Sequence, residues 1–94
     1  MTREVRLSVR ARIDIDRLVD FLVEKSPSAA KRARETLLVA LLSLEEMPER
    51  GRPGPLDDLR ELSIRFGHAG YVIQYRVDAA RVFVTHIFHT LEGG

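Results

Sequence analysis

Two histidines near the end of the chain, His86 and His89, carry the side chains best suited to proton transfer. Imidazole titrates near neutral pH, so a histidine can serve as a general acid or base. His89 is the better catalytic candidate, and His86 is expected to face the core side of its strand. A simpler interpretation of His89 is a strand-end histidine that bonds to backbone or water, and we favour it. The sequence therefore assigns no catalytic residue and leaves His89 as a candidate.

The same histidines do not predict a metal site. Residues three apart on a strand point to opposite faces, so these two side chains cannot share an ion. The chain lacks a phosphate-loop pattern, zinc-ligand spacing and a nucleophile-elbow motif. It also contains no cysteine, which excludes disulfides and thiolate chemistry. We therefore expect neither a metal nor another cofactor.

Arginine dominates the positive charge of the chain. Of 15 basic residues, only Lys25 and Lys31 are lysines. Arginine suits bidentate contact with carboxylate or phosphate, although arginine-rich codon usage or solvated sheet-edge charge would give the same composition. The net charge of +1 is too small to indicate nucleic-acid binding by itself. The arginines that could bind a partner in the C-terminal half are Arg60, Arg65, Arg76 and Arg81.

These arginines and histidines stand in a stretch of strand-type sequence from Leu59 to His89. Three runs rich in Val, Ile, Phe and Tyr are separated by short breaks at 67–70 and 78–80. The breaks are too short for a crossover helix, so neighbouring strands must pair antiparallel. The stretch therefore predicts a three-stranded meander.

Alternation within the runs predicts which side chains face a core. Tyr71 and Tyr75 share the more apolar face of the second run, so we expect them in the core rather than in catalysis. The third run is apolar on both sides, which is typical of a central strand or of one that meets a partner. Phe88 is expected on the core side. The face away from the helices is expected to show Val72, Gln74, Arg76, Phe83, Thr85, Ile87 and His89.

The N-terminal half supplies elements that would cover the other face of the sheet. Residues 4–7 alternate as in a short strand, and a helix follows from the N-cap Ser8 to near residue 25. Asp14 is expected on the solvent face of this helix. A second helix begins at Ser26-Pro27 and carries Leu41 on its apolar stripe. Because only a residue or two joins the helices, they form a tight antiparallel hairpin.

The order of elements predicts an α+β fold, β-α-α-β-β-β, as a single domain over residues 1–94. The helical hairpin would pack on one face of a mainly antiparallel sheet. Pro48 ends the second helix, and residues 48–55 form a loop rich in glycine and proline. The N-terminus lacks a signal-peptide core and no segment could span a bilayer, so we expect a cytoplasmic protein without membrane contact.

Four fragments resemble, in order, motifs of the RelE/ParE superfamily of bacterial toxins. Residues 47–53, MPERGRP, resemble the P-x-x-G-R-P loop, and residues 59–62, LREL, resemble the R-E-L strand opening. Residues 70–77, GYVIQYRV, resemble the Y-x-I-x-Y-R strand, and residues 87–89, IFH, the closing I-x-H. Each fragment alone is weak, but the four at matching spacing cover nearly the whole chain.

The resemblance implies the toxin of a type II toxin–antitoxin module. A labile antitoxin would bind and neutralise it, with a segment that folds on binding. The superfamily divides by target. RelE-type members cut mRNA, commonly on the ribosome, whereas ParE-type members act on DNA gyrase without being enzymes.

The positions that match ribonuclease active sites favour the ParE branch. Ribonuclease members carry a glutamate in the mid-chain loop, an arginine early in the third strand and a terminal histidine followed by tyrosine, or use lysines. The matching residues are Gly54, Val72, His89 and Thr90, so only the histidine is retained. ParE-like relatives often carry an arginine three residues before the final histidine, where this chain has His86.

Three interpretations of function follow. The favoured one is a non-enzymatic, ParE-like inhibitor of DNA gyrase. The second is a RelE-like ribonuclease with a reduced active site that acts on ribosome-bound mRNA, and the third is an interaction domain without toxicity. The candidates for contact with target or antitoxin are Arg60, Arg65, Arg76, Phe83, Ile87 and His89.

Overall fold

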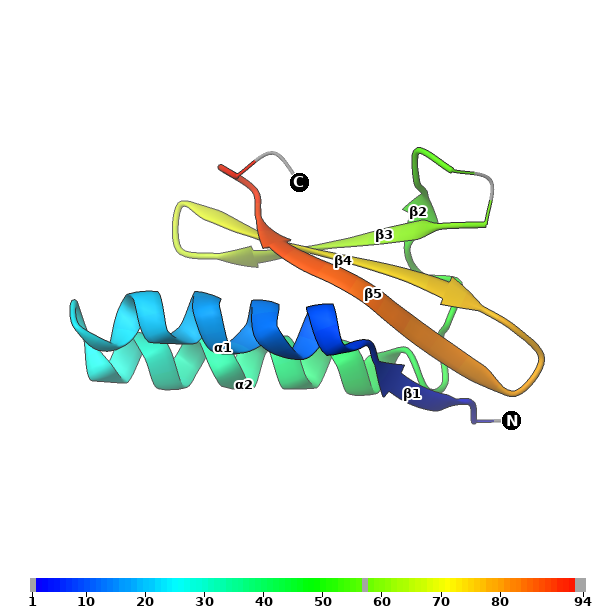
Figure 1. Cartoon of the computed structure of the whole chain (residues 1–94), viewed down its shortest axis with the longest axis horizontal. Coiled ribbons are helices and arrows are strands. Elements are labelled where there is room, and N and C mark those ends of the chain that lie inside the picture. The colour runs from blue at the N-terminus through cyan, green and yellow to red at the C-terminus, as the bar shows by residue number, and fades with distance from the viewer. Residues whose placement is uncertain (1, 57, 93–94) are drawn as a thin grey trace.

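The computed structural model describes residues 2–56 and 58–92. Within that part, two helices lie side by side on one face of a five-stranded sheet, and the other face carries no helix (Figure 1). This arrangement confirms the predicted α+β fold. The elements are β1 Glu4–Leu7, α1 Val9–Val23, α2 Pro27–Ser43, β2 Arg52–Pro53, β3 Arg60–Phe66, β4 Ala69–Val77 and β5 Arg81–His89.

Both helices begin where the sequence predicts. The Ser8 side chain accepts a hydrogen bond from the Ala11 N–H at 2.9 Å, and the Ser26 side chain accepts one from the Ala29 N–H at 3.2 Å. The second helix ends at Ser43, earlier than Pro48, because the next residues leave it through tighter turns. Neither helix is long and apolar enough to cross a membrane, as judged over the described residues.

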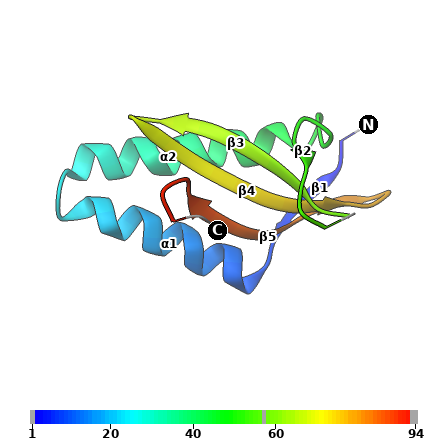
Figure 2. The same cartoon turned by 90° about the horizontal axis from the view of Figure 1, so that it is seen from above.

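The strand order in the sheet is β1-β5-β4-β3-β2. The meander of β3, β4 and β5 is antiparallel as predicted, and β1 pairs with β5 in parallel. Seen from above, the meander runs along the two helices (Figure 2). The loop predicted at 48–55 contains β2, which pairs with Arg60 and Glu61 of β3. A two-residue strand is too short to show alternation, so its sequence carries no signal.

The core lies between the helices and the meander. Leu41 of α2 is 5% exposed, and Tyr71 and Tyr75 of β4 are 2% and 0% exposed, which confirms their predicted positions. Leu37 of α2 is 0% exposed. Other residues of this buried cluster include Ala11, Ile15, Leu18, Ala33, Leu44, Leu62, Ile73, Val82, Val84 and Ile87.

A bulge in β5 overturns part of the predicted exposed face. Gln74 pairs with His86 and Tyr75 pairs with Val84, which leaves Thr85 as an extra residue. One extra residue moves every later side chain to the opposite face. Ile87 is therefore 0% exposed and belongs to the core, so its predicted place on the exposed face is wrong.

The same bulge reverses the other side chains that follow it. His89 pairs with the core residue Tyr71 and lies on the helix side, contrary to the prediction. His86 and Phe88 pair with Gln74 and Val72 on the opposite side, so their predicted core-side positions are also wrong. Val72 does lie on the predicted face, but it is only 6% exposed.

Ser8, the N-cap of α1, forms hydrogen bonds to this bulge. The Ser8 N–H donates to the Val84 carbonyl at 2.9 Å, and the Ser8 hydroxyl donates to the Thr85 carbonyl at 3.0 Å. One residue thus caps α1 and satisfies two carbonyls where β1 gives way to the helix. The bulge is therefore anchored by a contact between distant parts of the chain.

Candidate functional site

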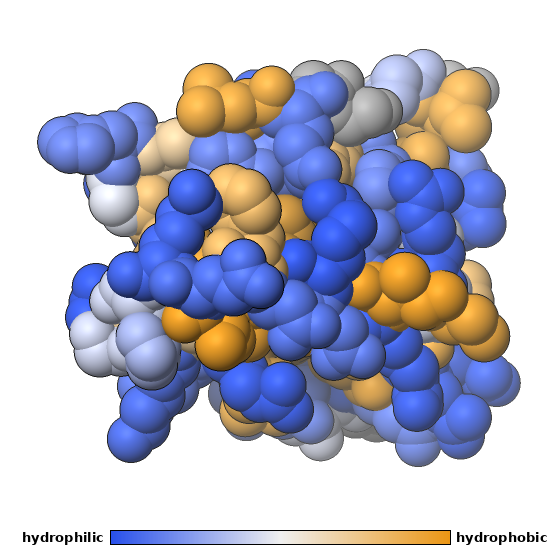
Figure 3. Space-filling view, turned by 60° about the vertical axis from the view of Figure 1, so that its left-hand side comes forward, coloured by the Kyte–Doolittle hydropathy of each residue, from blue (hydrophilic) through white to orange (hydrophobic). Residues whose placement is uncertain are grey.

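His89 lies in a pocket between α1, the β3–β4 hairpin and the turn that follows β5. The pocket has a volume of about 380 Å³ and is lined mostly by apolar side chains, among them Phe21, Phe66 and Leu91. Phe21 is 66% exposed and Leu91 is 83% exposed. Figure 3 brings this end of the molecule toward the viewer and shows its apolar residues as separate patches among hydrophilic ones.

Hydrogen bonding decides what the His89 imidazole can do. Its Nδ1 accepts a hydrogen bond from the Leu91 N–H at 3.2 Å, and its ring meets Tyr71 edge-on with centroids 5.6 Å apart. Because Nδ1 is the acceptor, the neutral ring carries its hydrogen on Nε2. In this state Nε2 can donate a hydrogen bond but cannot take up a proton. A general-base role for His89 would require breaking its contact with Leu91.

The arginine beside His89 is already paired. Arg17 Nη1 and Nη2 lie 2.6 and 3.3 Å from the two carboxylate oxygens of Glu92. The hydrogen bond from Arg17, with a second from the His89 N–H, lowers the pKa of Glu92 below its ordinary value. Among the described residues that line the pocket, Arg17 is the one arginine or lysine. The site therefore places no uncommitted cation next to the histidine.

A second histidine site lies on the edge of β5 beyond the end of β1. The β1–β5 pairing ends at Val84, so α1 covers the following part of that edge. Oδ2 of Asp14 in α1 accepts the Ile87 N–H at 2.9 Å and lies 2.7 Å from His86 Nδ1. The Asp14 carboxylate thus accepts the hydrogen bond from Ile87 that a neighbouring strand would otherwise accept.

The environment of Asp14 keeps its carboxylate ionised. Burial acts to raise its pKa, but hydrogen bonds from the Ile87 N–H and the His86 ring outweigh burial and lower it. The Arg10 Nε also lies 3.3 Å from this carboxylate. An ionised Asp14 makes His86 Nδ1 a donor, which leaves Nε2 as the acceptor in the neutral ring.

Sequence reasoning missed this site because an acidic residue was assigned to the solvent face of α1. Asp14 is instead 2% exposed, the one buried charged residue in the part of the chain that the structure describes. Its spacing carries the missing signal, since Ala11 and Leu18, three residues before and four after it, both lie in the core. Residue type alone was misleading here.

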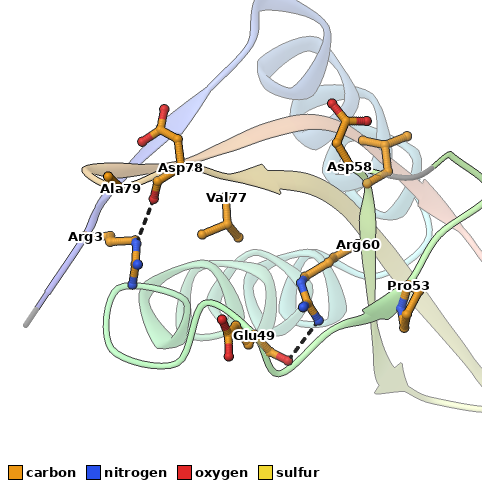
Figure 4. A pocket seen from close by; sticks show the side chains of 9 residues that line it. Arg3, Glu49, Pro53, Asp58, Arg60, Val77, Asp78 and Ala79 are labelled. Atoms are coloured by element: carbon orange, nitrogen blue, oxygen red, sulfur yellow. Dashed lines mark hydrogen bonds between the residues drawn. The ribbon is translucent and has the colours of Figure 1, made fainter.

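Arg60 holds the loop before it and faces a pocket of about 490 Å³ (Figure 4). Its Nη1 donates to the Gly51 carbonyl at 2.8 Å and to the Glu49 carbonyl at 3.3 Å. The Gly51 N–H in turn donates to the Tyr75 hydroxyl at 2.8 Å. This predicted binding residue thus has a structural role, because it binds the carbonyl of Gly51 while Tyr75 binds the N–H of the same residue.

The other predicted binding residues are spread over the sheet. Arg76 lies opposite Phe83 across β4 and β5, and its Nε is 2.9 Å from an Asp58 carboxylate oxygen. Phe83 is 39% exposed. Arg65 is exposed near the end of β3. The structure therefore brings Arg76 and Phe83 together but leaves Arg60, Arg65 and His89 apart from them.

The residues at ribonuclease-matched positions do not converge on His89. Val72 lies on the opposite face of the sheet, because its partner is Phe88 whereas His89 pairs with Tyr71. Gly54 donates its N–H to the Leu59 carbonyl, at the far end of β3 from that pairing. Across the described residues, no group of three or more His, Cys, Asp or Glu is placed to hold a metal ion.

Comparisons with known proteins agree on the kind of protein. Residues 5–93 match the model of the family described as ParE toxin of type II toxin–antitoxin system, parDE. The chain is 50% identical over 93 residues to Toxin RelE1 of Caulobacter vibrioides, which covers 98% of each protein. It is 39% identical over 90 residues to Toxin RelE3 of the same organism, covering 96% of this chain and 97% of that toxin.

A solved structure shares the fold. The toxin–antitoxin structure titled Chromosomal ParDE TA system from P. aeruginosa contains a chain that matches with a TM-score of 0.78 and 18% identity. The match covers 94% of this chain and 96% of the other. The protein therefore belongs to the ParE toxin family of the RelE/ParE superfamily and is the toxin of a type II toxin–antitoxin module.

Proposed function

We propose that this toxin acts by binding DNA gyrase and not by cutting RNA, and that a cognate antitoxin neutralises it by binding. The observation that carries the proposal is the state of His89. Its Nδ1 is engaged by the Leu91 N–H, and the neighbouring Arg17 is engaged by Glu92. The matched nuclease histidine thus lacks both a free acceptor nitrogen and a free cation.

The energetics of RNA cleavage support the same choice. Attack by a ribose 2′-hydroxyl needs a base, an acid and cations that stabilise the charge on the phosphorane. A positioned histidine contributes roughly 10²- to 10⁴-fold as an acid or base, whereas stabilisation of the developing charge usually accelerates such reactions more. Val72, at the matched cation position, is a buried apolar residue on the other face.

A binding surface is available on the opposite end of the sheet. Arg76, Arg81 and Phe83 line a pocket of about 390 Å³ on β4 and β5. Arginines and aromatic residues are enriched where protein interfaces concentrate their binding energy. We assign contact with the target to this group.

The ribonuclease alternative stays open because both Caulobacter relatives named above are called RelE toxins. If this chain cuts ribosome-bound mRNA, its reduced active site must draw on His89 or on His86. The neutral His86 ring has Nε2 as its acceptor, since Nδ1 faces the Asp14 carboxylate.

The two functions are separated by assaying one purified protein for inhibition of gyrase supercoiling and for cleavage of ribosome-bound mRNA. We expect inhibition of supercoiling, reduced about tenfold in Arg76→Ala, which corresponds to about 1.4 kcal/mol of binding energy. Arg12→Ala is the matched control, because Arg12 is exposed on α1, away from the pocket at Arg76. It should inhibit like the original protein.

A different pair of results would support the ribonuclease alternative. Cleavage of mRNA that is lost in His89→Ala or His86→Ala, with supercoiling unaffected, would replace the gyrase proposal with the ribonuclease alternative. Addition of the protein encoded by the neighbouring reading frame should abolish whichever activity is seen. A toxin that stays monomeric and fully active in micromolar amounts of that protein would contradict the proposed neutralisation.

A further inference from the structure

The pocket beside His89 is walled by aromatic and aliphatic side chains from four parts of the chain. Phe21 and Leu22 come from α1, Phe66 from β3, Tyr71 from β4 and Leu91 from the turn after β5. Its volume of about 380 Å³ lies at the lower end of the range for small-molecule sites, about 300–1,000 Å³. The pocket is therefore large enough for a molecule of one or two rings.

Hydrogen bonds hold the wall formed by Leu91 in place. The Thr90 N–H donates to the Gly70 carbonyl at 2.9 Å, and the Glu92 N–H donates to the His89 carbonyl at 2.8 Å. The Glu92 carboxylate also accepts the His89 N–H at 2.7 Å. Because these bonds already fix the turn, a ligand need not order it, which lowers the free-energy cost of binding.

The aromatic side chains of the pocket favour a flat ring as the occupant. The ring centroids of Phe66 and Tyr71 lie 5.7 Å apart, and the Tyr71 ring meets His89 edge-on. On the α1 wall, Lys25 Nζ lies 5.0 Å from the centroid of the Phe21 ring, a cation–π contact that helps to hold this exposed ring. Offset and edge-to-face contacts with such rings stabilise an aromatic ligand beyond the area that it buries.

The charged side chains of the pocket lining neutralise each other. Arg17 Nη1 lies 2.6 Å from a carboxylate oxygen of Glu92. Among the described residues that line the pocket, these two are the ones of the Asp, Glu, Lys and Arg types. A charged ligand would have to compete with this ion pair, so the lining favours a neutral one.

The His89 imidazole supplies a hydrogen-bond donor to this apolar site. Its Nδ1 accepts the Leu91 N–H, so the neutral ring carries its hydrogen on Nε2. No described residue hydrogen-bonds to Nε2, and no buried side-chain nitrogen in the described parts of the chain lacks a partner, so Nε2 is accessible. A ligand that satisfies this donor must carry a hydrogen-bond acceptor.

We propose that the pocket beside His89 binds a small, neutral aromatic molecule with one hydrogen-bond acceptor at its edge. The ring of the ligand would pack among Phe21, Phe66 and Tyr71, and its acceptor would bind the hydrogen on His89 Nε2. This small-molecule site goes beyond the proposed binding of gyrase and antitoxin. It also lies at the other end of β4 from Arg76, to which we assign contact with the target.

The surroundings of the pocket argue against a second copy of this chain as the occupant. Specific protein interfaces bury at least about 1,200 Å² in total, so a second copy would cover much more than the pocket. The apolar residues at this end of the molecule form separate patches among hydrophilic ones (Figure 3). A second copy would therefore bury hydrophilic side chains at a cost in free energy, whereas a small molecule would leave them in water.

NMR titration of the isotope-labelled toxin at pH 8 with two probes tests the site. Indan-1-one is a neutral fused bicycle with a carbonyl acceptor, and indole is a fused bicycle of similar size whose N–H is a donor. Indan-1-one should shift the signals of Phe21, His89 and Leu91 with a dissociation constant of about 1 mM, as expected for a ligand of about ten heavy atoms. Indole should bind about three- to tenfold more weakly, because it cannot accept a hydrogen bond from Nε2.

Variants separate the donor from the apolar wall. His89→Phe keeps an aromatic ring but removes the donor, so it should bind the two probes with affinities within about twofold of each other. Phe21→Ala removes part of the wall and should weaken the binding of both probes about three- to tenfold. Phe21 is exposed, so this variant should keep its fold. Val9→Ala is the matched control, because Val9 is an exposed apolar residue of α1 outside the pocket lining, and it should bind both probes like the original protein.

Several results would overturn the inference. Unshifted signals of Phe21 and Leu91 at about 5 mM indan-1-one would remove the site, and indole binding as tightly as indan-1-one would remove the role of the donor. Equally strong shifts at Phe83, in the pocket at the other end of β5, would show unspecific adsorption. Shifts of Phe21 that depend on toxin concentration without a probe would show that a second copy fills the pocket. These measurements need neither gyrase nor antitoxin, so they are decided separately from the proposed function.

Discussion

Asp14 shows how one buried side chain can complete a sheet. Its carboxylate accepts the Ile87 N–H and faces His86 Nδ1 where β1 no longer covers β5. These contacts favour the ionised form and lower the pKa of Asp14 despite its burial. A carboxyl group whose pKa is lowered by folding stabilises the protein above its unfolded pKa and ceases to do so as pH falls through its folded pKa.

The free energy of unfolding should therefore decrease as pH falls below about 4, the unfolded pKa of an aspartic acid. Asp14→Asn removes the titrating group, so the variant should be less stable at pH 7 and should lose less stability between pH 7 and pH 3. Urea denaturation at a series of pH values measures how steeply the free energy of unfolding of each protein changes with pH. An equal pH dependence in the two proteins would show that Asp14 does not cause it. Asp16→Asn is the control, because Asp16 is exposed on the same helix.

Gly51 and Tyr75 form a second residue-scale contact. The Tyr75 hydroxyl accepts the Gly51 N–H at 2.8 Å, and a Cβ at position 51 would lie 2.5 Å from that oxygen. Gly51→Ala should therefore destabilise by clash, and Tyr75→Phe should cost about 1–3 kcal/mol by leaving a buried N–H unpaired. Because Tyr75→Phe removes the nearest clashing atom, the double variant should be more stable than the sum of the single effects predicts.

Thermal or urea unfolding of the four proteins measures this coupling. A double variant whose loss equals the sum of the two single losses would contradict the proposed clash with the hydroxyl. The result also bears on Arg60, a predicted binding residue, because Arg60 donates to the carbonyl of the same glycine.

At the scale of elements, α2 stabilises the fold through one stripe of apolar side chains. Leu41 is 5% exposed, whereas the next residue, Leu42, is 59% exposed. Leu41→Ala should reduce the free energy of unfolding by roughly 2–5 kcal/mol, the usual cost of truncating a buried leucine. Leu42→Ala, measured by the same urea titration, should change it by less than about 0.5 kcal/mol. Similar losses in both variants would contradict this assignment of the core face.

The helices and strands also show which features the sequence could predict and which it could not. Helix starts were predictable because Ser8, Ser26 and Pro27 act locally on the backbone that follows them. The bulge at Thr85 was not, because it depends on Ser8 reaching across from another part of the chain. Strict alternation then placed Ile87 and His89 on the wrong faces. In the candidate site, the tautomer of His89 and the burial of Asp14 likewise depend on contacts that no local pattern shows.

At the scale of the whole molecule, the uncovered face of the sheet and its open edge offer surfaces for different partners. Arg76 and Phe83 lie on β4 and β5, whereas the open edge belongs to β3 on the side next to α2. The groove between α2 and β3, which Val39 and Ile64 line, and the pocket at Arg76 share no lining residue. Arg76→Ala should therefore reduce target inhibition while leaving antitoxin affinity, measured by calorimetry, within about twofold of the original value. A parallel loss of antitoxin affinity would place both partners on one surface.

The pairing of β1 with β5 has a consequence for the timing of folding. Glu4–Leu7 pairs with Arg81–Val84, so the pairing that adds the edge strand β1 to the sheet joins residues that lie far apart in sequence. Such contacts raise contact order and slow folding, since a long loop must close before they form. During synthesis, β5 emerges after all the other strands and helices described here, and until then β1 has no neighbour. A nascent chain that stops before residue 81 therefore lacks the strand that joins β1 to the rest of the sheet.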